Sequence, residues 1–194
     1  MKFKSLKRNR LVKHLISDIS NNADWLQFFL IFSRFEYALK KSGFCISTQP
    51  RPSRIKSAKY FNNIPRQIKN NNLGYIYADW KRFGETIERE FWDGASNEVK
   101  GAINYLVENP PFVQYKNESK EIDWRPFGSI RQGISCLVDI IKTVRNNLFH
   151  GAKYPIMRYN PTGDTILIQN CIIVLKHMIT LNPEVQEHYF DNLE

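Results

Sequence analysis

The residues best suited to chemistry lie in the stretch KTVRNNLFHG, residues 142–151, where the pattern predicts the end of a helix. Within it, Arg145, Asn146 and His150 supply a permanent cation, an amide and a group that titrates near neutral pH. Cleaving RNA without a metal requires groups that remove the 2′-hydroxyl proton, protonate the leaving 5′-oxygen and hold the developing negative charge. The stretch is therefore a candidate site for metal-independent RNA cleavage.

The helix that must position these residues is predicted over residues 129–150. Its apolar residues recur every three or four positions and form one stripe; they are Ile130, Ile134, Leu137, Ile141, Val144 and Leu148. At about 100° per residue, Asp139, Asn146 and His150 fall together nearly opposite that stripe. Arg145 lies on the flank, and its side chain is long enough to reach the polar side. The helix is thus expected to have an apolar seam for the core and a polar seam that ends in His150.

The polar seam also has a plain structural explanation. Such a seam is usually a solvated helix face, and a histidine near the end of a helix places a favourable charge at the negative end of its dipole. Gly151 would then be the left-handed residue that stops the helix. Spacing alone favours this explanation, whereas the combination of Arg, two Asn and His favours a catalytic site. One chain offers a single histidine here, so a two-fold dimer would be needed to supply two.

The motif resembles the hallmark of the HEPN superfamily, named from higher-eukaryote and prokaryote nucleotide-binding domains. That hallmark is an Arg, usually followed by a polar residue, with a His a few positions later. Here it reads Arg145, Asn146, Asn147, Leu148, Phe149, His150 and Gly151. The stretch FSRFEYALKKSGF, with Arg34 and Glu36 as its polar insertions, also resembles the first core helix of several bacterial members. The resemblance covers residues 22–45 and 128–182.

The resemblance implies a single all-α domain over residues 1–194, built as a HEPN-like antiparallel helical bundle. Many small bacterial members are metal-independent endoribonucleases that dimerise to build the active site, in toxin–antitoxin or antiviral defence settings. Carried over to this chain, Arg145 would bind the scissile phosphate and His150 would be the general base or acid. Asn146 would position the substrate or the histidine. The expected RNA products have 2′,3′-cyclic phosphate and 5′-hydroxyl ends. No cofactor or metal is expected. The expected partners are RNA, a second copy of the chain and an antitoxin or regulatory protein.

Two other functions fit the same residues. The first is a non-catalytic RNA- or nucleotide-binding module that holds phosphate with the polar seam. The second is an interaction protein whose polar seam serves only dimerisation. Loss of RNA cleavage on substitution of His150 would favour the enzyme over both.

A basic, partly irregular insertion is predicted over residues 46–76. From Tyr37 to Ala78 there is no Asp or Glu but there are eight Lys or Arg. The segment is either a solvated loop or part of an RNA path, and uncompensated positive charge favours RNA. The expected substrate contacts are Arg51, Arg54, Lys56 and Lys59, together with Asn147 and Lys153 near the motif. The aromatic residues available to stack on bases are Tyr60, Phe61, Tyr75 and Tyr77.

Other elements supply the frame around the motif. Further helices are predicted over residues 22–42, 78–92, 97–109 and 165–181, a polar connection over residues 116–128, and a basic helix or arm over residues 1–20. No strand pattern is recognised. Glu36 lies on an otherwise apolar helix, so a structural ion pair with Arg34 or a lysine is favoured over a role in ordering Arg145. Asp139 is a second candidate for a supporting role.

Bulk properties agree with a single cytoplasmic domain. The chain has 194 residues and a net charge of +9, which favours polyanionic partners such as nucleic acid. Cys45, Cys136 and Cys171 are too scattered for a metal site and read as reduced thiols. The basic N-terminus lacks the apolar run of a signal peptide, and no apolar stretch is long enough to span a membrane. His14, His177 and His188 are expected to be structural.

Overall fold

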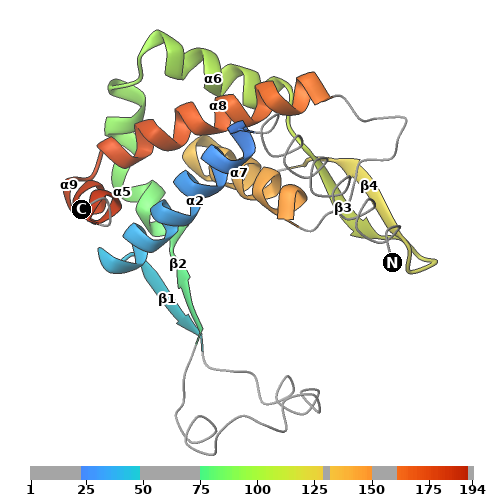
Figure 1. Cartoon of the computed structure of the whole chain (residues 1–194), viewed down its shortest axis with the longest axis horizontal. Helices are drawn as coiled ribbons and strands as arrows, with labels where there is room; N and C mark the ends of the chain where they lie inside the picture. Colours follow the sequence, from blue (N-terminus) through green and yellow to red (C-terminus); the bar gives the residue numbers. More distant parts are fainter. Residues whose placement is uncertain (1–22, 49–74, 129–131, 150–160, 192–194) are drawn as a thin grey trace, which may run out of the picture.

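The computed structural model describes residues 23–48, 75–128, 132–149 and 161–191. These residues form a mostly helical molecule with two small antiparallel hairpins (Figure 1). The elements are α2 (Ala23–Lys41), β1 (Cys45–Thr48), β2 (Tyr75–Ala78), α5 (Trp80–Asp93), α6 (Asn97–Glu108), β3 (Phe112–Lys116), β4 (Ile122–Pro126), α7 (Gly133–Phe149), α8 (Pro161–Thr180) and α9 (Pro183–Phe190). The predicted basic arm over residues 1–20 lies outside the described residues.

The prediction that the chain contains no strands is wrong. FVQYK and IDWRP pair as β3 and β4, with Val113 opposite Arg125 and Tyr115 opposite Asp123. Aromatic and β-branched residues favour this extended pairing. The side chain of Asn117 accepts the backbone N–H of Glu121 at 2.9 Å and closes the turn. Five residues of the expected polar connection over residues 116–128 therefore form strand β4.

The other hairpin, β1–β2, joins the ends of the basic insertion. α2 ends where Gly43 takes a φ of +76°, and the N–H of Phe44 donates to the carbonyl of Leu39 at 2.8 Å. This capping arrangement suits a glycine in the left-handed region, so the predicted stop of the helix is confirmed. The chain then enters β1, which pairs with β2 so that Thr48 lies opposite Tyr75. Residues 49–74 lie outside the described residues.

Aromatic side chains of α2 and α5 pack together in one part of the core, and aliphatic side chains of α7 and α8 fill much of the rest. Phe32 stacks on Trp80 with ring centroids 5.3 Å apart, and Phe35 meets Phe83 edge to face at 5.4 Å. α8 crosses this layer and packs against both α2 and α6 (Figure 1). The fully buried aromatic residues are Phe28, Phe35, Phe83 and Phe91, with Phe32 and Trp80 almost as deeply buried.

Helix α7 packs against α5, α6 and β3. The predicted apolar stripe is confirmed in the described residues, because Ile134, Leu137, Ile141 and Val144 are buried and Leu148 is partly buried against the core. The helix begins at Gly133, a little later than predicted. A Cβ added at Gly84 of α5 would lie 3.0 Å from Cγ2 of Ile134, so the two helices approach closely there.

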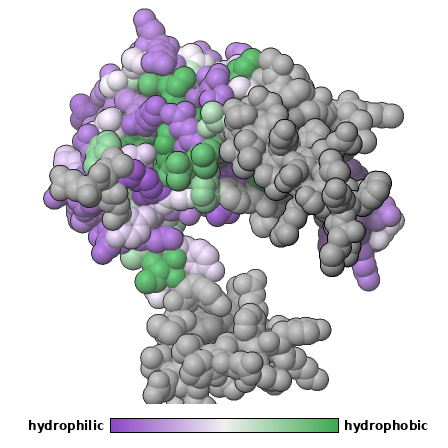
Figure 2. Space-filling model, viewed as in Figure 1, coloured by the Kyte–Doolittle hydropathy of each residue, from purple (hydrophilic) through white to green (hydrophobic). Residues whose placement is uncertain are grey.

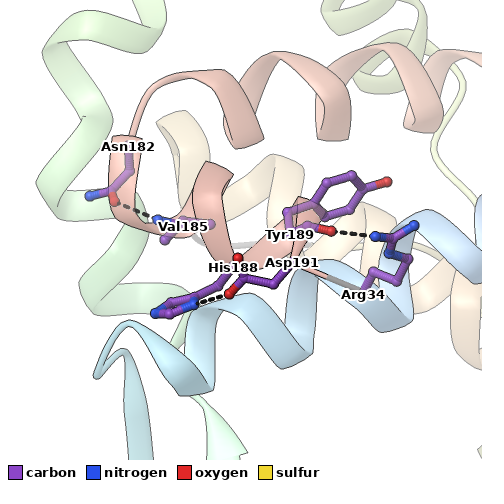
Figure 3. A network of polar contacts seen from close by, with 6 residues as sticks. All are labelled: Arg34, Asn182, Val185, His188, Tyr189 and Asp191. Atoms are coloured by element: carbon purple, nitrogen blue, oxygen red, sulfur yellow. Dashed lines mark hydrogen bonds and ion pairs between the residues drawn. The ribbon is translucent and has the colours of Figure 1, made fainter. Parts of the chain in front are cut away.

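The C-terminal part contains one helix that was predicted and one that was not. The helix over residues 165–181 is confirmed as α8, although it begins earlier, at Pro161. The short helix α9 follows, capped by Asn182, whose side chain accepts the N–H of Val185 at 3.0 Å. Figure 3 shows how α9 is fixed to α2: Arg34 donates to the backbone carbonyl of Tyr189, and its guanidinium carbon lies 4.9 Å from the Tyr189 ring centroid.

Within the described residues, no single helix has both the length and the apolar character of a membrane span. The bent pair of Asp164–Thr180 and Pro183–Phe190, at 115°, passes that test by length and composition only.

Candidate nucleic-acid site at the end of helix α7

The last turns of α7 carry the described part of the predicted motif. Arg145 and Asn147 are partly buried there, and Asn146 is exposed. Asp139 and Thr143, earlier on the same seam, are partly exposed. The polar seam therefore lies away from the buried stripe, as the helical wheel predicts. His150 and Lys153 lie outside the described residues, as do the expected insertion contacts Arg51, Arg54, Lys56 and Lys59.

Arg145 is held by an aromatic ring and an amide. Its guanidinium carbon lies 5.7 Å from the ring centroid of Phe32, a buried residue of α2. Its Nη1 donates to Oδ1 of Asn146 at 3.1 Å. The first contact is a cation–π interaction, and both restrict where the guanidinium can point. A guanidinium fixed in this way at the edge of the core is a suitable partner for phosphate.

Asn147 ties the end of α7 to a hairpin. Its Nδ2 donates to the backbone carbonyl of Phe112 in β3 at 2.8 Å. The side chain was expected to contact substrate, but in the structure its amide N–H satisfies a carbonyl of the protein. Asn147 therefore positions β3 against α7, two residues after Arg145.

The two carboxylates expected to support the site are placed differently. Glu36 accepts a hydrogen bond from Nε1 of Trp80 at 3.3 Å, whereas Arg34 binds the carbonyl of Tyr189. Within the described residues Glu36 meets an indole and not a cation, so the favoured ion pair is wrong. Asp139 lies six positions before Arg145, roughly 9 Å along the helix axis.

The two described histidines contact other groups of the protein, and the three cysteines differ in exposure: Cys45 is exposed, Cys136 is partly buried and Cys171 is buried. Nε2 of His177 lies 3.1 Å from the carbonyl oxygen of Phe91, and Nδ1 of His188 lies 2.7 Å from Oδ2 of Asp191 (Figure 3). Cys171 is fully buried, and burial raises the pKa of its thiol. Among the described residues, no cluster of three His, Cys, Asp or Glu side chains could hold a metal ion.

Two features of this surface were not foreseen from the sequence. One is Phe32 beneath the guanidinium of Arg145, and the other is the carbonyl of Phe112 that receives Asn147. Periodicity shows that Phe32 faces a core, but it does not say which helix lies opposite. The β-branched and aromatic residues of FVQYK favour a strand, but five residues are too few for alternation to identify β3.

Comparisons with known proteins add nothing to this picture: no protein-family model, no curated protein and no solved structure matches the chain. The chemistry of this surface therefore has to be argued from its own residues.

Proposed function

We propose that the chain is a metal-independent endoribonuclease with a HEPN-like motif, acting as a homodimer in a bacterial defence or toxin–antitoxin setting. The observation that supports this most is the placement of Arg145. Its side chain leaves the end of α7 half-buried, lies over Phe32 and is bonded to Asn146. Both contacts orient the guanidinium at the edge of the core, where it can meet a phosphate.

Each residue of the motif has a role in the proposed reaction. Arg145 binds the scissile phosphate and holds the negative charge that develops on it. Asn146 accepts from Arg145 through its Oδ1, which leaves its amide N–H groups to donate to the substrate. His150, five positions further along the chain, moves the protons. Two chains joined along their polar seams supply two histidines, one as base and one as acid.

A non-catalytic RNA- or nucleotide-binding module is the second candidate function. The same contacts between Arg145, Phe32 and Asn146 favour it, because a fixed guanidinium binds phosphate whether or not a bond is then broken. The two functions differ in what His150 does. The substitution that separates them is therefore His150→Ala.

The test is incubation of purified protein with total RNA in the presence of EDTA. Arg145→Ala and His150→Ala are compared with the wild type, with Arg89→Ala and His188→Ala as matched controls. Arg89 is highly exposed and paired with Asp93 on the surface of α5, and His188 is a histidine of α9. We expect the wild type and both controls to cleave, and both motif variants to lose activity by about 100-fold or more.

Three results separate the candidate functions. Loss of cleavage in both motif variants, with circular dichroism and oligomeric state unchanged, supports the enzyme. Binding of RNA by the wild type without cleavage supports the binding module. If neither substitution changes binding or cleavage, the polar seam has no role with RNA.

A further inference from the structure

Three cations gather at the root of the β1–β2 hairpin. Lys40 and Lys41 form the last turn of α2, and Arg82 lies in the first turn of α5. None of the three has a carboxylate partner within the described residues. Lys41 and Arg82 are exposed and Lys40 is partly exposed, so their charges face solvent.

Contacts between side chains and backbone bring these cations together. Nη1 of Arg82 lies 3.4 Å from the carbonyl oxygen of Gly43, which follows directly on the end of α2. The guanidinium carbon of Arg82 lies 5.5 Å from the ring centroid of Phe44. Nζ of Lys41 lies 5.8 Å from the ring centroid of Tyr37. Two of the three cations are therefore held over aromatic rings, which limits the entropy that they lose on binding a ligand.

The acidic residues nearest in sequence already have partners. Asp79 caps α5 by accepting the backbone N–H of Arg82 at 3.1 Å. Glu85 pairs with Lys81 at 3.6 Å on the exposed face of α5. Glu36, four residues before Lys40, accepts from Nε1 of Trp80 at 3.3 Å. Among the described residues, none of these three carboxylates forms an ion pair with Lys40, Lys41 or Arg82, so each cation can bind an external anion.

The hairpin concentrates this charge further. The acid-free stretch runs from Tyr37 to Ala78, and the pairing of β1 with β2 brings its two ends side by side. Exposed aromatic surface lies at the same place, because Tyr37 is 43% exposed and Tyr77 is 52% exposed. Figure 2 shows hydrophilic residues around the root of the hairpin and apolar ones on it. Cations beside exposed aromatic rings are what single-stranded nucleic acids bind.

The hairpin root and the end of α7 are connected through a short series of rings. Phe32 lies under the guanidinium of Arg145 and stacks on Trp80, the first residue of α5. Lys81 and Arg82 follow Trp80 directly in sequence. Both places therefore rest on the same buried rings, which fixes their positions relative to each other.

We propose that Lys40, Lys41, Arg82 and Tyr37 form a surface, the hairpin-root patch, that binds single-stranded RNA extending from the Arg145 site. This inference rests on the proposed function, since it takes RNA as the substrate. Lys40 and Lys41 also complement the dipole at the end of α2. That role predicts a loss of stability on substitution but no change in RNA affinity.

The test measures RNA binding in a chain that cannot cleave. In the His150→Ala background, Lys41→Gln combined with Arg82→Gln is compared with Lys100→Gln combined with Lys176→Gln. Lys100 of α6 and Lys176 of α8 are exposed cations outside the patch, so both pairs lower the net charge equally. Binding of a labelled 20-nucleotide single-stranded RNA is followed by fluorescence anisotropy at several salt concentrations.

We expect the patch variant to bind several-fold more weakly. The slope of log K against log salt should become shallower by about 1.4, the value for two lost phosphate contacts on a single strand. The control pair should change both quantities far less. In the otherwise wild-type chain, the patch substitutions should raise KM for long RNA and leave kcat unchanged.

Equal weakening by the two pairs would overturn the proposal, because only the general positive field would then matter. Tighter binding to phosphatidylserine vesicles than to RNA would also overturn it. Thermal unfolding shows whether Arg82→Gln has disturbed the fold. If it has, RNA binding by a variant with Lys40→Gln and Lys41→Gln is compared with the control pair in the same way. The assay also works if the wild type cleaves no RNA, so failure of the proposed function is distinguished from failure of this inference.

Discussion

At the scale of single residues, Asn147 shows how a polar side chain beside a candidate site can serve the fold. Its Nδ2 donates to the Phe112 carbonyl in a partly buried position. We expect Asn147→Ala to lower the free energy of unfolding by about 0.5–1.5 kcal/mol, because the hydrogen bond between α7 and β3 is lost. Asn147→Asp should lower the free energy of unfolding further, since a negatively charged carboxylate would then face a carbonyl oxygen. Urea unfolding of both variants measures this.

The same variant tests the role expected from the sequence. Among molecules that remain folded, we expect Asn147→Ala to bind single-stranded RNA as the wild type does. A tenfold loss of affinity with unchanged stability would contradict the structural role and restore Asn147 as a substrate contact.

Residue types and spacing predicted part of the candidate site. They placed Asn146 on the polar side of a helix and Arg145 on its flank; in the structure Asn146 is exposed and Arg145 is partly buried over Phe32. The partners of these side chains could not be predicted, because a helical wheel describes only one helix. Glu36 illustrates this: the sequence offered several cations as partners, whereas tertiary packing brought it to the indole of Trp80.

At the scale of elements, the close contact between α5 and α7 depends on a glycine, Gly84, at the point where the helices meet. A Cβ at Gly84 would lie 3.0 Å from Cγ2 of Ile134, whereas a Cβ at Gly101 of α6 would have nothing within 4 Å. We expect Gly84→Leu to lower the free energy of unfolding by about 1–3 kcal/mol through overpacking. Gly101→Leu should raise it by up to about 1 kcal/mol, because leucine is a better helix former than glycine.

Thermal and chemical unfolding of the two leucine variants measures the difference. Because α7 carries Arg145, Gly84→Leu should also weaken RNA binding, through displacement of the helix. Similar stabilities for the two variants would mean that α5 and α7 do not approach as closely as described.

The elements were predicted unevenly, for physical reasons. Long helices carry many turns of apolar periodicity, so α2, α5, α6, α7 and α8 could all be recognised. The strands span only four or five residues each, too few for alternation to stand out. Helix α9 is also short, although Asn182 followed by Pro183 is a recognisable start signal.

At the scale of the whole molecule, the proposed dimer makes a prediction that a monomeric enzyme does not. If two chains supply one reaction centre, with one histidine as base and the other as acid, that centre needs His150 of both chains. Co-expression of the wild type with His150→Ala gives mixed dimers that keep only one of the two histidines. We expect these mixed dimers to retain far less than half of the wild-type activity on RNA.

Tandem affinity purification through two different tags isolates the mixed dimers for assay. The wild-type and His150→Ala homodimers, purified in the same way, serve as the active and inactive controls. Mixed dimers with about half of the wild-type activity would contradict a reaction centre shared between chains, because each chain would then carry a complete centre of its own.

The register of β1 and β2 makes one segment of this chain replaceable. Because Thr48 lies opposite Tyr75, the ends of residues 49–74 are one strand spacing apart, about 5 Å. A two-residue turn such as Asn-Gly can join strands at that spacing. In a flexible loop, each doubling of the length destabilises the folded state by only about 0.6 kcal/mol. Insertions of very different length and composition can therefore be exchanged here, during evolution or by grafting, while the helices that carry Arg145 keep their packing.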